Sequence, residues 1–484
     1  MNLTGLIFLL FAHYFTGRGI VRLFRVEMTA VALFCFSLIC GVTVHSMVPC
    51  IMELLHVPIT VPNMYAWLAG SAVLFSIPLL LNIKQTKMPR LELPQLYELP
   101  FILIFLGLAA VSVWRCWYFP PTPRDVLTGT ELIAEFTVKE HTMRNSVFSV
   151  DYRLNGAANN MFKSPFITGL QVIYKMLVLP FGQLWLSVLF IAFTTWLYTL
   201  IRSIVHPLLA GILMLIYFAI PDLFAYTYII LYDYSNMIFF FAGFYFMMRY
   251  LDNDRMNELL WVTFLFGMAT YIRSETLVLA AVVVVLMAWY QYRAKMPLKK
   301  IAIRAAVFMA GPLLFNFILS NVFIRNLVPA EFKLGDLLNH DMTNVSELFA
   351  RYKELLMDLM FSSKGEQVFA HFYIFFLAVL GIDIVATRKF SKDGGLALWG
   401  VLVVFLTLGL LCFLIPSHTV INSAKRGLFK LIPLMVLYMA HSGILQKLSA
   451  YLRRKEEAAT QKGTVAAAPA ERATPAPKQV KGKK

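Results

Sequence analysis

Charged residues are scarce in this sequence of 484 residues. Asp, Glu, Lys and Arg together make up 14% of it, whereas 59% of the residues are hydrophobic. A soluble globular protein has about a quarter charged residues, which cover its surface with groups that water solvates. This composition excludes a disordered chain, a collagen-like chain and a soluble enzyme, and it favours a polytopic membrane protein.

Cysteine is also scarce, with five residues in the whole sequence. All five lie in or beside apolar runs, without the spacing of metal ligands, at Cys35, Cys40, Cys50, Cys116 and Cys412. We therefore predict small buried side chains, and we predict neither a disulfide framework nor a metal site.

Long apolar runs are the main feature that the sequence does contain. A helix needs about 20 apolar residues to cross the hydrocarbon core of a bilayer. Thirteen runs approach this length, near residues 3–16, 29–51, 65–83, 99–117, 181–203, 206–223, 227–250, 257–272, 274–291, 301–322, 367–385, 395–415 and 428–447. The sequence therefore predicts an all-α protein with about 13 transmembrane helices, although the first run is short and two others adjoin at Arg273.

Positive charges are in excess, since 43 Lys and Arg stand against 27 Asp and Glu, for a net charge of +16. They gather in alternate loops, beginning with Arg18, Arg22 and Arg25, whereas the short loops at 52–64 and 224–226 contain none. Because cytoplasmic loops are enriched in Lys and Arg, this pattern predicts an outer N-terminus and a cytoplasmic C-terminus. The excess positive charge then indicates the orientation of the chain in the membrane, and it does not indicate a nucleic-acid partner.

Two outer loops, at residues 118–180 and 323–366, are long enough to hold functional residues. Each contains an apolar stripe at helical spacing, over residues 166–177 in the first loop and 345–359 in the second. In the first of these segments, Thr168, Gln171 and Lys175 would lie on a different face of the helix from the apolar residues. Both stripes predict amphipathic helices that lie in the outer membrane interface.

Carboxylates and cations close to the apolar runs are the candidate functional residues, because a charge buried in a membrane is expensive unless it is paired. Asp125 follows prolines at positions 120, 121 and 123, which end a helix and hold this carboxylate just above the membrane. Arg273 and Glu275 lie between two apolar runs. Further candidates on the same proposed face are Arg124, Glu131, Asp151, Asp222, Asp233, His418, Lys425, Arg426 and Lys430.

Such a set of side chains is what a transfer reaction at a lipid phosphate needs. One carboxylate accepts the proton of an acceptor hydroxyl, and cations neutralise the departing phosphate. Each residue also has a simpler interpretation, as a helix cap or as a member of an ion pair. Glu135 with Lys139, for example, has the spacing of an ordinary pair on a helix surface.

Three segments of the sequence resemble the GT-C glycosyltransferases. The first combines an early Asp in an outer loop with Lys163-Ser164-Pro165 and an amphipathic helix. The second, residues 265–277, is similar to a Gly-x-x-x-Gly-x-Ala-x-x-x-Arg-Pro-Glu-Gly stretch of the mannosyl- and aminoarabinosyltransferase branches, with Ser274 in place of proline. The third, residues 425–433, resembles a late Arg-Tyr segment of the same branches, with Gly427 where Tyr is common.

The resemblance spans residues 99–447 and implies a GT-C-like catalytic domain there. Residues 1–98 would then be an N-terminal extension of three membrane helices. From about Arg453 the sequence is rich in Ala, Pro, Lys and Thr, which cannot build a core, so we expect residues 448–484 to be a disordered basic cytoplasmic tail.

The resemblance also implies an activity. Such a protein would be an inverting glycosyltransferase of the inner membrane, acting on the periplasmic face. Its donor would be a polyprenyl-phosphate sugar and its acceptor a glycan, a lipid or a protein, with no metal and no cofactor. By matching position, Asp125 would be the general base and either Asp222 or Asp233 the second acidic residue. Contacts to the donor phosphate would come from Arg273, Lys425 and Arg426.

Other classes of protein share these features. A transporter or flippase of a lipid-linked saccharide also has many spans and intramembrane charges, but the internal repeats typical of transporters are not evident here. An O-antigen polymerase or ligase would use a pyrophosphate-linked donor instead. A scaffold without activity is a further alternative, because Ser274 and Gly427 depart from the family pattern. Convergence of Asp125, Arg273 and Arg426 on one cavity would favour the transferase.

Overall fold

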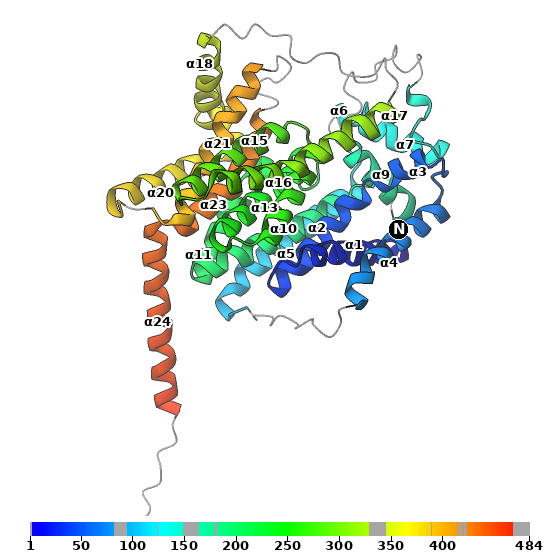
Figure 1. The fold of residues 1–484 in the computed structure, drawn as a ribbon. Coiled ribbons are helices and arrows are strands. Elements are labelled where there is room, and N and C mark those ends of the chain that lie inside the picture. Colours follow the sequence, from blue (N-terminus) through cyan, green and yellow to red (C-terminus); the bar gives the residue numbers. More distant parts are fainter. Residues whose placement is uncertain are drawn as a thin grey trace, which may run out of the picture.

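The computed structural model describes residues 2–81, 94–122, 124–148, 164–178, 182–328, 345–388, 390–414, 420 and 424–467. The regular elements among these residues are all helices, and no strand occurs in this part of the chain, so the predicted all-α class is confirmed. The helices form one bundle, from which the last helix, α24 (Gly443–Ala467), projects as a single rod (Figure 1).

Seven helical segments in the described ranges are long and apolar enough to cross a membrane. They are α1 (Leu3–Phe24), α2 with α3 (Ala30–Leu54), η2 with α5 (Leu96–Tyr118), α10 (Leu184–Ile204), α15 (Thr276–Arg293), α16 through α17 (Leu298–Leu327) and α21 (Lys392–Leu414). An eighth would be the pair Lys425–His441 and Gly443–Ala458, which is bent by 55°. The fold is therefore consistent with a membrane protein, but the predicted 13 spans are not confirmed.

The difference arises from helices that are too short or that are not apolar enough over a membrane-spanning length. Helices α11 (Pro207–Phe218) and α20 (Phe372–Ala386) are apolar, but they have only 12 and 15 residues. Helix α13 (Tyr232–Asn253) lies beside α14 (Met256–Ile272) and is buried along most of its length; it is long, but it is not among the helices that are apolar enough to span. Burial does not account for the difference, since the span formed by α2 and α3 is 72% buried and still qualifies.

Further elements connect these helices and complete the bundle. They are α3 (Val48–Leu54), α4 (Val61–Leu81), α6 (Arg124–Leu127), α7 (Thr130–Glu140), η3 (Ser146–Phe148), α9 (Pro165–Leu177), α12 (Pro221–Ala225), η4 (Ile318–Ile324), α18 (Val345–Lys353), η6 (Glu354–Met360), α19 (Ser363–Phe369), α22 (Lys425–Gly427), η8 (Leu428–Lys430) and α23 (Leu431–His441). The five cysteines are free and buried, which confirms the prediction of small buried side chains.

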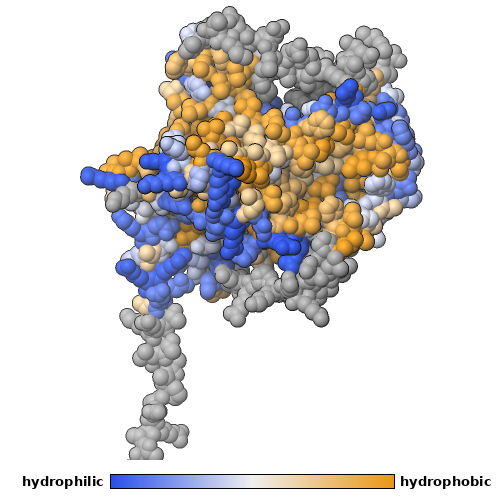
Figure 2. Space-filling view, viewed as in Figure 1, coloured by the Kyte–Doolittle hydropathy of each residue, from blue (hydrophilic) through white to orange (hydrophobic). Residues whose placement is uncertain are grey.

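Large apolar side chains are exposed on several outer helices. Examples are Val73 on α4, Leu103 on α5 and Val385 on α20, which are 66%, 59% and 75% exposed. Figure 2 shows hydrophobic residues over much of one face, with hydrophilic residues gathered near the base of α24. A surface of this kind is stable when lipid or another apolar surface covers it.

Close packing of α1 against α2 depends on glycine. A Cβ atom at Gly41 would lie 1.8 Å from the His13 carbonyl oxygen, whereas a Cβ at Gly70 on α4 would meet no atom within 4 Å. We expect Gly41→Ala to lower the free energy of unfolding by about 1–3 kcal/mol through overpacking, and Gly70→Ala to leave it unchanged or higher. Thermal unfolding in detergent measures both, and an unchanged Tm in Gly41→Ala would contradict this packing.

The two predicted amphipathic segments are helical, but the first does not lie in a membrane interface. Helix α9 has buried polar residues, Thr168 and Gln171, as well as buried apolar residues. Helix α7 packs against it, so α9 is internal, which corrects the prediction. The second segment, α18 with η6, contacts α21, where the Tyr352 hydroxyl donates to the Leu406 carbonyl at 2.5 Å.

The C-terminal segment also differs from the prediction. Helix α24 continues through residues 448–467, for which the composition predicts disorder, and residues 468–484 lie outside the described part of the chain. The helix begins at Gly443, whose N–H donates to the buried carboxylate of Asp383 at 2.8 Å. The alanines, lysines and glutamates of this segment favour helix even where they build no core.

Candidate active site

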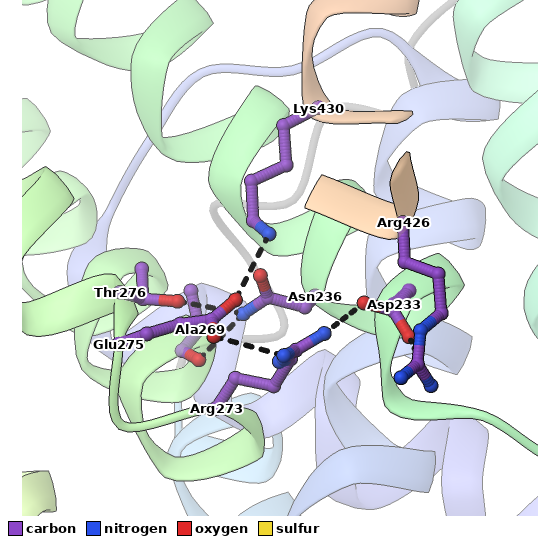
Figure 3. Close-up of polar contacts among 8 residues, drawn as sticks. All are labelled: Asp233, Asn236, Ala269, Arg273, Glu275, Thr276, Arg426 and Lys430. Carbon is purple, nitrogen blue, oxygen red and sulfur yellow. Dashed lines mark hydrogen bonds and ion pairs between the residues drawn. The ribbon is translucent and has the colours of Figure 1, made fainter. Parts of the chain in front are cut away.

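A cluster of charged side chains lies where three distant parts of the sequence meet (Figure 3). Asp233 belongs to the first turn of α13, and Arg273 with Glu275 forms the break between α14 and α15. Arg426 and Lys430 reach these residues from α22 and η8. The structure therefore brings together five of the candidate residues named from the sequence, Asp233, Arg273, Glu275, Arg426 and Lys430. We call these five residues the charge cluster.

A local interruption of the helices positions Arg273. Helix α14 ends at Ile272, and Arg273 adopts an extended backbone, which directs its side chain toward α13. The side-chain amide of Asn236 bridges the interruption, because it donates to the Ala269 carbonyl at 2.7 Å and to Thr276 Oγ1 at 2.8 Å. Asn236 thus joins the end of α14 to the start of α15 beside the charge cluster.

Ion pairs connect the five members of the charge cluster. Arg273 pairs with Asp233 through Nη1, and its Nη2 lies 2.8 Å from Glu275 Oε2. The other oxygen of Asp233 lies 3.9 Å from Arg426 Nη1, and Glu275 Oε1 lies 3.6 Å from Lys430 Nζ. The side chains of Asp233 and Lys430 are 1% and 0% exposed. Burying charges this deeply lowers the stability of a protein. Buried charged clusters of this kind are typical of functional sites.

Lys430 is the fully buried cation of the cluster. Its Nζ makes no hydrogen bond to any residue in the described part of the chain, and Glu275 is its ion-pair partner. An ammonium group has three N–H donors, and leaving them unsatisfied in a buried site is costly. Three cations stand against two carboxylates in the cluster, so its formal charge is positive. This arrangement suits the binding of an anion.

A second ion pair lies near the charge cluster. Lys425 Nζ lies 2.8 Å from Asp222 Oδ2, and the two side chains are 27% and 28% exposed. Burial and then the Asp233 carboxylate raise the pKa of the Tyr226 hydroxyl, with a smaller contribution from Asp222. Tyr226 therefore lies near both carboxylates, and its ring packs edge-on against Phe429. Asp222 is the more accessible of the two carboxylates.

Arg124 and Asp125 begin helix α6, but their side chains lie outside the described part of the structure. A backbone hydrogen bond shows where the chain runs just before them, since the Thr122 carbonyl accepts the N–H of Ile230 at 3.3 Å. Thr122 and Ile230 stand three residues before Asp125 and Asp233, respectively. The segment that leads into α6 therefore runs beside the segment that leads into α13.

Glu131 belongs to a different buried group. It lies on α7 and contacts α9, where Lys175 Nζ is 2.5 Å and Gln171 Nε2 is 2.6 Å from its carboxylate oxygens. Burial raises the pKa of Glu131, while Lys175 and Gln171 oppose that shift. These contacts join α7 to α9 rather than to the charge cluster. The two remaining candidates, Asp151 and His418, lie outside the described residues.

Sequence reasoning missed three residues of the site, Asn236, Thr276 and Tyr226, and it named Lys430 as a candidate without assigning it a role. Helical spacing is a signal that would have found Asn236 and linked Lys430 to Arg426. Asn236 follows Asp233 by three residues, and Lys430 follows Arg426 by four, so each pair lies on one helix face. Tyr226 and Thr276 carry no comparable signal.

A buried histidine pair was also missed. His13 Nδ1 lies 2.7 Å from His45 Nδ1, and these residues come from α1 and α2, which are both candidate spans. The second ring nitrogen of His13 contacts the Tyr174 hydroxyl at 3.1 Å, and that of His45 contacts Ser71 Oγ at 2.8 Å. Ionisable residues are rare within membrane spans and often have a function there.

Two further observations complete the description of the site. In the described ranges, no group of three or more His, Cys, Asp or Glu side chains is arranged to hold a metal ion. Comparisons with protein-family models, with curated proteins and with solved structures gave no match to this chain. A functional conclusion must therefore come from the charge cluster and from the residues around it.

Proposed function

We propose that this protein is a membrane glycosyltransferase that transfers a sugar from a polyprenyl-phosphate donor to a hydroxyl of a glycan, lipid or protein acceptor. One observation carries the proposal, namely the buried charge cluster with its excess of cations. Both later GT-C-like segments, residues 265–277 and 425–433, contribute to this cluster. Two segments with the same family resemblance thus meet in one site, which supports a shared role.

The cations of the cluster suit a phosphate ligand. A guanidinium binds phosphate through paired N–H donors, and its carboxylate partner fixes its orientation. In this proposal Asp233 is a positioning residue, which holds Arg273 and Arg426 on either side of its carboxylate. Lys430 then supplies N–H donors that have no hydrogen-bond partner among the described residues.

The proposed reaction is a direct displacement with inversion. Asp125 accepts the proton of the acceptor hydroxyl, whose oxygen forms a bond to the anomeric carbon of the sugar. The bond between that carbon and the phosphate oxygen breaks, and its electron pair leaves with the lipid phosphate. Arg273, Arg426 and Lys430 stabilise the charge that develops on the phosphate. Asp222, which is more exposed than Asp233, would orient the acceptor.

The proposed location follows from the orientation of the chain. The positively charged loops lie on the cytoplasmic side in this proposal, so the charge cluster faces the periplasm from the inner membrane. A polyprenyl-phosphate donor would then reach the cluster from the outer leaflet of the bilayer.

Replacing Lys430 with Met separates function from stability. Because the substitution removes a buried cation without a hydrogen bond and leaves Glu275 paired with Arg273, we expect an unchanged or higher Tm. We expect transfer to fall about a hundredfold, since a donor to the leaving phosphate is lost. Thermal unfolding and product mass measure the two effects. Lys447→Met, on the exposed side of α24, is the matched control, and a large fall in Tm for Lys430→Met would assign Lys430 a structural role.

The test of the proposal compares membrane extracts from cells with and without the protein. We expect one glycan, lipid or protein to lose the mass of a single sugar when the protein is absent. The corresponding polyprenyl-phosphate sugar should accumulate in the same extract. If all masses are unchanged and no such donor accumulates, the protein is not a glycosyltransferase in those cells.

The histidine pair favours a second candidate function, a transporter or flippase of a lipid-linked saccharide. Chains of ionisable residues within membrane spans serve as proton relays in transporters, and His13 with His45 and Tyr174 has that form. The same extracts distinguish the two functions. A flippase changes the leaflet in which the lipid-linked saccharide resides, whereas a transferase consumes it in vitro when the acceptor is present.

A further inference from the structure

Two adjoining cavities lie between helices, away from the charge cluster. The first has a volume of about 270 Å³ and lies between α5, α10 and α11, with an apolar lining that includes Phe101, Phe105, Met214 and Phe218. The second, of about 190 Å³, lies between the start of α2 and the later turns of α10 and α13. Val31, Thr199 and Arg202 line both cavities, so the two lie next to each other at these residues.

The cavities are distinct from the candidate active site. Arg249 lines the second cavity near the end of α13, whereas Asp233 stands in the first turn of the same helix. Sixteen residues separate them, which corresponds to about 24 Å along a helix. The start of α2 follows Arg18 and Arg22, in the second half of α1, and Arg25 at its end. The sequence predicts that these arginines lie on the cytoplasmic side.

The second cavity has a positive lining. Arg202 and Arg249 face it, and both guanidiniums are held in place by carboxylates. Arg202 Nε lies 3.1 Å from Glu98 Oε2, and Arg249 Nη2 lies 3.0 Å from Glu258 Oε1. The first residues of α2 form another wall of this cavity, so the positive end of that helix dipole faces the same space.

The first cavity adjoins the second and offers a mainly apolar environment. Most of its walls are aromatic and aliphatic side chains, although Glu98, Thr194, Thr195 and Arg202 also line it. The neighbouring surface of α5 is apolar and exposed, with Leu106 55% exposed. A free phosphate ion would gain nothing from such a neighbouring space, whereas a hydrocarbon chain would fill it. The two adjoining cavities therefore match a molecule with an anionic head and an apolar chain.

We propose that the two cavities bind an anionic phospholipid of the cytoplasmic leaflet. Its phosphate lies between Arg202 and Arg249, and one acyl chain lies between α5, α10 and α11. Basic pockets between helices on this side of a membrane attract anionic headgroups, because that leaflet is rich in anionic lipid. The inference is independent of the reaction at the charge cluster, since it holds for a transferase and for a transporter.

The test uses the purified full-length protein, stripped of lipid in detergent, and native mass spectrometry. Phosphatidylglycerol and phosphatidylcholine with identical acyl chains are compared, with inorganic phosphate as a third ligand. We expect phosphatidylglycerol to bind about tenfold more tightly than phosphatidylcholine, and phosphate not to compete. Equal binding of the two lipids would overturn an anionic site, and competition by phosphate would indicate a site for a free anion.

Two variants locate the binding. Thr199→Trp fills the junction of the cavities and should abolish the preference for phosphatidylglycerol, whereas Leu103→Trp on the exposed side of α5 should preserve it. The double variant Arg249→Gln/Glu258→Gln removes the guanidinium without leaving a buried carboxylate unpaired, and it should lower binding about tenfold. Unchanged binding in Thr199→Trp would overturn the proposal, whether or not the double variant folds.

Discussion

Replacing Arg273 with Gln is expected to lower the free energy of unfolding by about 3–5 kcal/mol and to abolish activity. The guanidinium lies between Asp233 and Glu275, and the substitution would leave two carboxylates in a buried site with weaker partners. Arg426 and Lys430 stand 3.9 Å and 3.6 Å from these carboxylates, too far to replace the lost hydrogen bonds. Thermal unfolding in detergent measures the loss of stability.

A second variant separates the structural role of Arg273 from its proposed functional role. Asp233→Asn combined with Arg273→Gln removes one charge of each sign, so we expect most of the stability to return while activity stays absent. Arg255→Gln is the control, because its pair with Glu27 is exposed and should change stability by at most about 1 kcal/mol. If the double variant regains activity together with stability, Arg273 does not contact the donor.

Asp125→Asn is expected to abolish the proposed sugar transfer while membrane insertion and Tm stay unchanged. An amide cannot accept the proton of the acceptor hydroxyl, and loss of a general base lowers a rate by about 10² to 10⁴-fold. The measurement is the mass of the glycosylated product in membranes of cells that carry only the variant. Protein abundance in the same membranes reports insertion.

Glu135→Gln is the matched control for Asp125→Asn. Glu135 is an acid of the same predicted outer segment, but it forms an exposed pair with Lys139 on α7, so its loss should leave the proposed transfer intact. Full activity of Asp125→Asn would contradict its assignment as the base. Asp222→Asn would then be the informative variant, because Asp222 is the accessible carboxylate beside the charge cluster.

Several features of the site follow from the sequence because they are local. Arg273 and Glu275 stand between two apolar runs, where a charge persists only with a partner. Asp233 and Arg426 were found by the same reasoning, and the structure brings all four residues together. Their partners come from distant segments, so the sequence could not show that Asp233 is enclosed by two guanidiniums while Asp222 remains accessible.

The helical class, the apolar runs and the charged positions at their ends can be predicted from the sequence, because each depends on neighbouring residues. How these runs pack against one another depends on contacts between distant segments. Helix α13 is buried by other helices. The polar side chains of α9 are buried as well, whereas an isolated amphipathic helix would expose them to water. The structure also decided that His13 meets His45 and that Lys430 is buried beside Glu275. The physical reason is that hydropathy measures the cost of exposure to water, whereas only packing determines which protein or lipid surface removes that exposure.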